Sequence, residues 1–192
     1  NHLEYLQADI LDLYLLGRKF DIIESVGVLH HMNKPIAGWK ILTDLLNPGG
    51  LMKIGLYSEL ARHQIVKIRE EIAFLKVGTS EADIRKFRWS LGEKCKEEHH
   101  RLITSNDFYS LSTVRDLIFH VQEHRFTILQ IQDYLEELGL KFCGFENKNN
   151  ISRFREFHGN KSDIYDLALW HQFEKSNQHA FVGMYQFWCQ KV

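Results

Sequence analysis

The residues of this chain best suited to chemistry are two adjacent histidines, His30 and His31, which follow a strongly apolar run. An imidazole exchanges a proton near neutral pH, so either side chain could orient a ligand or accept a proton from it. Gly27 precedes them and would let the backbone approach a ligand closely. The structural alternative is that one histidine packs beneath a following helix while the other is solvated.

The apolar run over residues 20–26 predicts a strand buried on both faces. A helix is expected next, with Asn33 as its cap, Pro35 in its first turn, and its end at Asn47-Pro48-Gly49-Gly50. Ligands of open α/β sheets bind at the carboxyl ends of the strands, so the turn over residues 25–31 lies where chemistry is expected.

Later segments alternate between helical and strand patterns. Residues 51–57 predict a second buried strand, and Thr127 and Gln130 have the spacing of a capping box before a helix that stops at Gly139. Two helices are expected to form a hairpin through the apolar residues Ala61, Ile65, Ile68, Ile72, Leu75, Ile84, Phe87 and Leu91. A closing antiparallel pair of strands is expected over residues 141–146 and 180–188, with a helix over 162–175 between them.

Residues 20–57 resemble the fourth strand, following helix and fifth strand of class I S-adenosylmethionine-dependent methyltransferases. The motifs that carry the resemblance are Leu29-His30-His31-Met32 and Asn47-Pro48-Gly49-Gly50. It implies an α/β fold with a Rossmann-like sheet of order 3-2-1-4-5-7-6, ending in an antiparallel strand pair. The resemblance covers nearly the whole chain, and it is much less specific beyond residue 58.

The resemblance also assigns residues to the S-adenosylmethionine cofactor. Ala8-Asp9-Ile10 matches the end of the family's third strand, so Asp9 would bind the adenine amine and Ile10 the face of the ring; the plainer interpretation is that Asp9 caps a loop. The residues expected beneath the methionine part are Ser25, Val26, Gly27, Val28 and His30. His30 and His31 are the catalytic candidates, although methyl transfer from a sulfonium often needs only alignment of the acceptor with the methyl group.

The segment after Tyr57 is where such enzymes build the site for the methyl acceptor. Tyr57 and Arg62 follow the end of the fifth strand and would lie on the side of this acceptor site. Arg115 and His120 lie on a helix expected over residues 108–120. Arg115 would bind an acidic acceptor group, and Asp116 would pair with His120 four residues later on the same helix face. The alternative is a solvated helix face with an ion pair.

We therefore expect a partial methyltransferase core over residues 1–57 and 141–192, with a mostly helical insertion or lid over residues 58–140. The glycine-rich loop and the acidic residue that ends strand two are missing, since no GxGxxG motif occurs in the 192 residues. This predicts a fragment that binds the cofactor poorly or not at all by itself. The exposed edge of strand four predicts self-association, a rearranged fold or a proteolytic product.

The composition excludes several classes of protein. A hydrophobic content of 44% suits one globular domain, and a net charge of -1 favours neither nucleic acid nor an anionic membrane. The chain has no apolar run of about 20 residues and no signal-peptide pattern at its amino terminus. Cys95, Cys143 and Cys189 stand far apart, which argues for reduced thiols in the cytoplasm, and His99-His100 cannot easily chelate one metal ion.

The predicted function is methyl transfer to an unidentified acceptor, either a small molecule or a protein. A noncatalytic scaffold that grips a protein partner with the helices of residues 59–125 is the alternative. A nicotinamide-dependent oxidoreductase fits less well, because Leu29-His30-His31-Met32 and the closing antiparallel pair are typical of methyltransferases.

Overall fold

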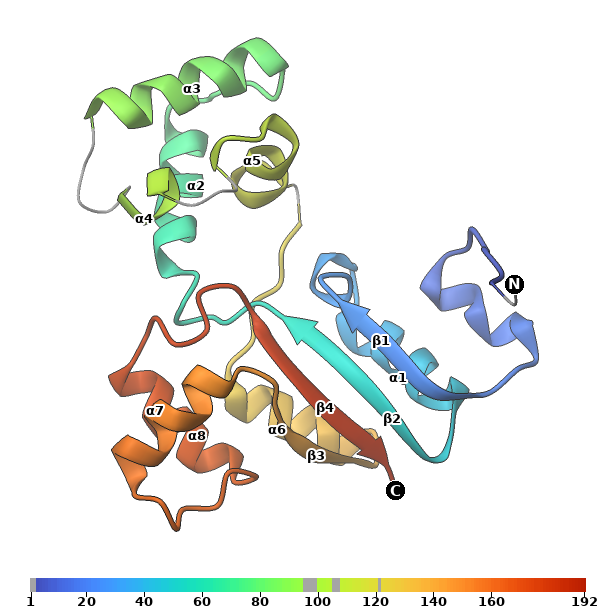
Figure 1. The fold of residues 1–192 in the computed structure, drawn as a ribbon. Helices are drawn as coiled ribbons and strands as arrows, with labels where there is room; N and C mark the ends of the chain where they lie inside the picture. Colours follow the sequence, from blue (N-terminus) through green and yellow to red (C-terminus); the bar gives the residue numbers. More distant parts are fainter. Residues whose placement is uncertain (1–2, 95–99, 105–107, 121) are drawn as a thin grey trace. The chain divides into compact units, whose positions relative to one another are not determined.

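The structure, a computed structural model, describes residues 3–94, 100–104, 108–120 and 122–192 (Figure 1). The chain divides into two compact units, of which the first comprises residues 1–61 and 124–192 and the second residues 62–123. The elements of the first unit are η1 (Ile10–Leu16), β1 (Phe20–Val26), η2 (Leu29–His31), α1 (Pro35–Leu45), β2 (Leu46–Leu56), α6 (Ile128–Glu137), β3 (Leu140–Phe145), α7 (Lys148–His158), α8 (Leu167–Ser176) and β4 (Tyr185–Lys191). The elements of the second unit are α2 (His63–Phe74), α3 (Glu81–Lys94), α4 (His100–Thr104) and α5 (Leu111–Ile118).

The four strands of the first unit form one mixed sheet in the order β1-β2-β4-β3. β1 and β2 run parallel, and β4 lies antiparallel to both β2 and β3. This is the order expected for the fourth, fifth, seventh and sixth strands of the methyltransferase sheet. The predicted α/β class, with a helical insertion and a closing antiparallel pair, is confirmed.

One face of the sheet carries the core of the first unit. In β2, Met52, Ile54 and Leu56 are fully buried, whereas Lys53 between them points to the opposite face and pairs with Glu146 at 2.8 Å. This alternation has the period of two expected for a strand. The helices α1, α6 and α8 cover the apolar face with the buried side chains Trp39, Leu42, Ile128, Ile131, Leu135, Leu167, Trp170 and Phe173.

β1 is covered on one face only, which corrects the expectation of a strand buried on both. Ile22 is 59% exposed and Val26 37% exposed, while Ser25 is buried among the core residues. Burial on both faces requires helices on both sides of a sheet. In the described part of the chain, the alternate side chains Ile22, Glu24 and Val26 are exposed, so one face of β1 is uncovered.

Several boundaries differ from the sequence-based expectations. α1 begins at Pro35 with Lys34 as its cap, so Asn33 does not cap it. β4 begins at Tyr185 rather than at residue 180, and α7 was not predicted, although Asn147 caps it by accepting from the N–H groups of Asn149 and Asn150. Residues 3–9 form no strand where the third strand was expected, since an extended segment gains ladder hydrogen bonds only beside a partner.

α6 begins as predicted at a capping box. The Gln130 N–H donates to Thr127 Oγ1 at 3.2 Å, and the Thr127 N–H donates to Gln130 Oε1 at 2.9 Å. Gly139 follows the helix with a φ of 65°, in the left-handed region that favours glycine. α6 belongs to the sheet unit, whereas the expected boundary at residue 141 placed it in the insertion.

The second unit has its own apolar core. Ile68, Ile72, Ile84, Phe87 and Leu91 are buried there as the predicted hairpin of helices requires. Leu75, which the pattern placed on the inward face, is exposed because α2 ends one residue before it. Val114 and Ile118 of α5 complete the cluster.

Candidate functional site

The carboxyl ends of β1 and β2 bring three aromatic side chains together. The ring centroids of His30 and Tyr57 lie 3.9 Å apart with 33° between the ring planes, and those of His30 and His31 lie 4.3 Å apart. His30 is fully buried. Parallel strands end at one edge of the sheet, so the residues that follow β1 and β2 meet at the edge where α/β proteins bind ligands.

The turn between β1 and His30 follows a tight path. Gly27 has a φ of 79°, a conformation that glycine adopts without steric cost, and its N–H donates to the Gly55 carbonyl at 3.3 Å. A side chain at this position would be strained, so the turn requires glycine. The flanking Val26 and Val28 are both partly exposed at this edge.

Asp9 and Ile10, the residues predicted to bind adenine, line an open groove on the first unit. The groove has a volume of about 580 Å³ and is lined by Asp9, Ile10, Leu11, Met32, Asn33, Lys34 and Ala37. Asp9 also caps η1, because its Oδ1 accepts from the Leu11 N–H at 2.8 Å. A carboxylate has capacity for further donors, so capping and ligand binding are compatible. Met32, which lines the groove, directly follows His30 and His31 in the chain.

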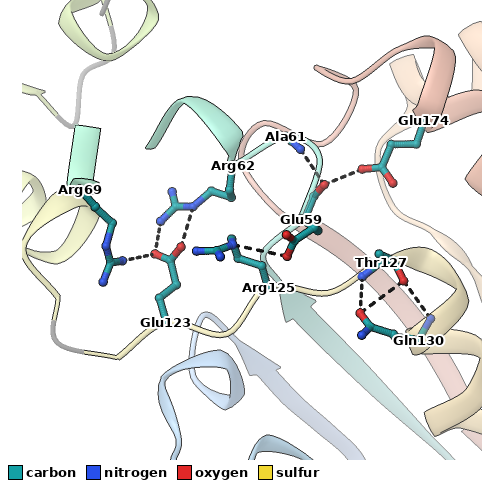
Figure 2. Close-up of polar contacts among 10 residues, drawn as sticks. Glu59, Ala61, Arg62, Arg69, Glu123, Arg125, Thr127, Gln130 and Glu174 are labelled. Carbon is teal, nitrogen blue, oxygen red and sulfur yellow. Dashed lines mark hydrogen bonds and ion pairs between the residues drawn. The ribbon is translucent and has the colours of Figure 1, made fainter. Parts of the chain in front are cut away.

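Two chain segments run side by side beyond β2. Ser58 forms a parallel bridge with Phe126, whose N–H donates to the Tyr57 carbonyl at 2.9 Å. The N–H of His124 donates to the His30 carbonyl at 2.8 Å. Figure 2 shows Glu59 and Arg125 of these segments facing each other, with 3.5 Å between Arg125 Nε and Glu59 Oε2. The backbone of His30 is therefore tied to the segment that returns to α6.

A buried carboxylate anchors the end of β2. Glu174 of α8 is fully buried, and its two oxygens accept hydrogen bonds of 2.6 Å from the hydroxyl groups of Ser58 and Tyr185. Burial raises the pKa of Glu174, and the two hydrogen bonds oppose that effect. Burial and the adjacent Glu174 carboxylate also raise the pKa of Tyr185.

Arg62, a predicted substrate residue, lies inside the second unit. Its side chain is nearly fully buried, and its Nε donates to Glu123 Oε1 at 3.3 Å while its Nη2 contacts Glu123 Oε2. Arg69 Nη1 lies 3.2 Å from the same carboxylate (Figure 2). Arg69 also donates to the His120 carbonyl. This geometry favours a structural role for Arg62, joining the first residue of the unit to the last.

The other predicted substrate residues of the second unit are not brought together as expected. Arg115 lies in α5, but α5 ends at Ile118, so His120 falls outside the helix and cannot share a helix face with Asp116. His120 Nδ1 instead accepts from the Gln122 N–H at 3.2 Å.

Glu174, Tyr185 and Glu123 were not predicted from the sequence as components of this region. One signal was available: Glu174 follows Trp170 by four residues and so continues the apolar stripe of its helix. A charged residue on a buried stripe indicates a satisfied polar network. The partners of Glu174 are 116 and 11 residues away along the chain, which no local pattern reveals.

No group of three or more His, Cys, Asp or Glu side chains in the described residues is arranged to hold a metal ion. Cys95 and His99 lie outside the described residues. Within the described ranges, no helix combines the length and apolar character that a membrane-spanning segment requires.

Comparison with known proteins agrees with this fold. Residues 1–54 match the family described as "Methyltransferase domain". The predicted resemblance to class I S-adenosylmethionine-dependent methyltransferases is confirmed.

Individual relatives are longer than this chain. An uncharacterized protein of Synechococcus sp., syc1184_c, is 28% identical over 186 residues, which cover 90% of this chain and 44% of that protein. The structure of PKMT2 from Rickettsia typhi is similar with a TM-score of 0.66 and 16% identity, covering 95% of this chain and 37% of that one. The same protein in complex with AdoHcy gives a TM-score of 0.61, 17% identity and the same coverage. The chain thus spans less than half the length of these relatives.

Proposed function

We propose that this chain is part of a longer S-adenosylmethionine-dependent methyltransferase and carries the strand-end side of its active site. The observation that supports this most is the meeting of the Gly27 turn with the His30 and Tyr57 rings at the carboxyl ends of β1 and β2. Asp9 and Ile10 line a groove that also includes Met32, which directly follows the two histidines. The family match over residues 1–54 includes the turn and the groove.

The residues present fit the cofactor that the family implies. Asp9 can accept a hydrogen bond from the adenine amine, Ile10 offers an apolar surface to the ring, and the turn at Gly27 lets the backbone approach the methionine part. When bound, S-adenosylmethionine supplies an electrophilic methyl group on a sulfonium. His30 and Tyr57 would orient the acceptor, and His31 is the candidate to accept a proton from an acceptor that is protonated at neutral pH.

The test is isothermal titration of S-adenosylmethionine and S-adenosylhomocysteine into this chain and into a version extended upstream by about 100 residues, one further βαβ unit with its lead-in. We expect binding by the extended version and little or none by the shorter one. Asp9→Ala should weaken binding to the extended version, and Asp12→Ala, a matched change in the same segment, should not. An extended version that binds neither compound would contradict the proposal.

A noncatalytic scaffold is the second candidate, and one feature of the helical unit favours it. An open groove of about 450 Å³ is lined by Arg85, Arg88, Trp89, Gly92, Glu93, Phe108 and Tyr109. Trp89 is 72% exposed and Tyr109 71% exposed, and both residue types are enriched at the energetic centres of protein interfaces. Failure of the extended version to bind either compound would favour this candidate.

A further inference from the structure

We propose that Glu174 is a positioning residue whose buried carboxylate fixes the end of β2 and so holds the Tyr57 ring against His30. The consequence for catalysis rests on the proposed function, whereas the effect on the two rings does not. Glu174 lies on α8, more than 100 residues along the chain from both rings.

Two hydrogen bonds hold the Ser58 hydroxyl group. It donates to Glu174 Oε1 at 2.6 Å and accepts from the Ala61 N–H at 2.9 Å. Figure 2 shows the Glu174 side chain reaching from its helix toward the segment that precedes Ala61. A distance of 2.6 Å is at the short end of the range for an O–H donor and an oxygen acceptor, so this contact defines where Ser58 lies.

Tyr57 lies between two residues that are both anchored, Leu56 and Ser58. Leu56, directly before it, pairs in the sheet with Tyr185, and Tyr185 donates to the other oxygen of Glu174 at 2.6 Å. Ser58, directly after it, is held by the first oxygen. Because successive side chains of an extended chain point to opposite faces, fixing Leu56 and Ser58 directs the Tyr57 side chain away from Glu174.

Burying the Glu174 carboxyl group costs free energy. In the described structure, the two hydrogen-bond partners of Glu174 are both neutral hydroxyl groups. These two contacts therefore bring no positive charge to offset the cost of burying the carboxyl group. A buried carboxyl group without an opposite charge is expensive, and glutamine would occupy nearly the same volume without the charge. Costly polar groups of this kind are expected where a site needs a defined geometry.

The experiment compares the aromatic proton signals of His30 and Tyr57 by NMR in the 192-residue chain and its variants. In the wild type, the Tyr57 ring should displace the His30 Cε1–H signal upfield. Ser58→Ala and Glu174→Gln should each move that signal toward the position of an exposed histidine. Tyr185→Phe leaves the contact between Ser58 and Glu174 intact and should produce a smaller change.

Asp166→Ala is the matched control, because Asp166 caps the same helix by accepting from the N–H groups of Ala168 and Leu169. It should lower the melting temperature without moving the His30 signal. The proposal is overturned if Ser58→Ala and Glu174→Gln leave the signal in place, or if Asp166→Ala moves it equally. If one of the two test variants does not fold, the other decides. The cofactor titration is independent, so its failure would remove the catalytic meaning and leave the positioning result standing.

Discussion

At the scale of single residues, Glu123 shows how one carboxylate can hold together the two ends of a unit. It accepts a hydrogen bond from Arg62, the first residue of the helical unit, and contacts Arg69 of α2. Its side chain is fully buried and that of Arg62 is 4% exposed, so solvent screens this contact very little. Glu123 therefore supplies negative charge to two arginines at once.

Glu123→Gln should therefore destabilise the chain by about 3–5 kcal/mol, because it removes one partner of a buried ion pair. Urea unfolding followed by circular dichroism measures the change. Arg69→Met is the matched control: it leaves the Arg62 and Glu123 pair in place and removes a more exposed partner, so it should cost clearly less. Equal stability of Glu123→Gln and the wild type would show that the pair contributes nothing.

A second prediction concerns the pH dependence of the Glu174 network. Because burial raises the pKa of Glu174 above its ordinary value of 4.5, the unfolded chain releases this proton at a lower pH than the folded chain does. Stability of the wild type relative to Glu174→Gln should therefore fall as the pH rises from about 4.5 through the folded-state pKa, and stay constant above it. Unfolding free energies of both proteins between pH 4 and 8 test this; a difference that does not vary with pH would contradict it.

Residue positions could be predicted from the sequence where a local motif was present. The pattern of Leu29-His30-His31-Met32 after an apolar run placed His30 at the end of a strand, and the structure sets it beside Tyr57. The roles predicted for His30, Tyr57 and the other site residues remain predictions. The contacts of Arg62 could not be foreseen, because its partner Glu123 is 61 residues away in the chain.

At the scale of elements, α6 is defined most sharply by its own sequence. The Thr127 and Gln130 side chains satisfy each other's backbone N–H groups, and Ile128, Ile131 and Leu135 fall on one buried face. By contrast, α7 was not predicted and the start of β4 was misplaced. Phe181, near the start predicted for β4, is buried among aromatic side chains of the core although it lies outside the strand.

Thr127→Ala should lower the free energy of unfolding by about 1 kcal/mol, the usual cost of losing a helix cap. Gln130→Ala should have a smaller effect of the same sign, since it removes the reciprocal half of the box. Gln132→Ala in the same helix is the control, because the only hydrogen bond of its side chain in the described structure is a 3.4 Å contact with Glu136 at the surface. Thermal unfolding of the three variants measures these effects, and a Thr127→Ala variant as stable as Gln132→Ala would contradict the prediction.

At the scale of the whole molecule, the strand order could be predicted from the order of the elements along the chain. Two apolar runs with a helix between them come first, and the closing antiparallel pair follows. The division into two units was only approximately foreseen: α6 is helical in sequence but packs on the sheet. Helical periodicity identifies an apolar face, and it does not say which sheet or helix that face will cover.

The same strand order leaves β1 at the edge of the sheet, and we propose that this edge causes self-association. Ile22 is 59% exposed there and Val28 is 44% exposed, next to backbone groups of an edge strand that can pair with another chain. Light scattering should therefore show a molar mass that rises with concentration above that of the 22.7 kDa monomer. Ile22→Lys should shift the chain toward monomer, because a charge on an edge strand opposes pairing. Val182→Lys, at a comparably exposed apolar position outside the sheet, should not. A wild-type chain that stays monomeric at every concentration would show that the exposed edge is tolerated without a partner.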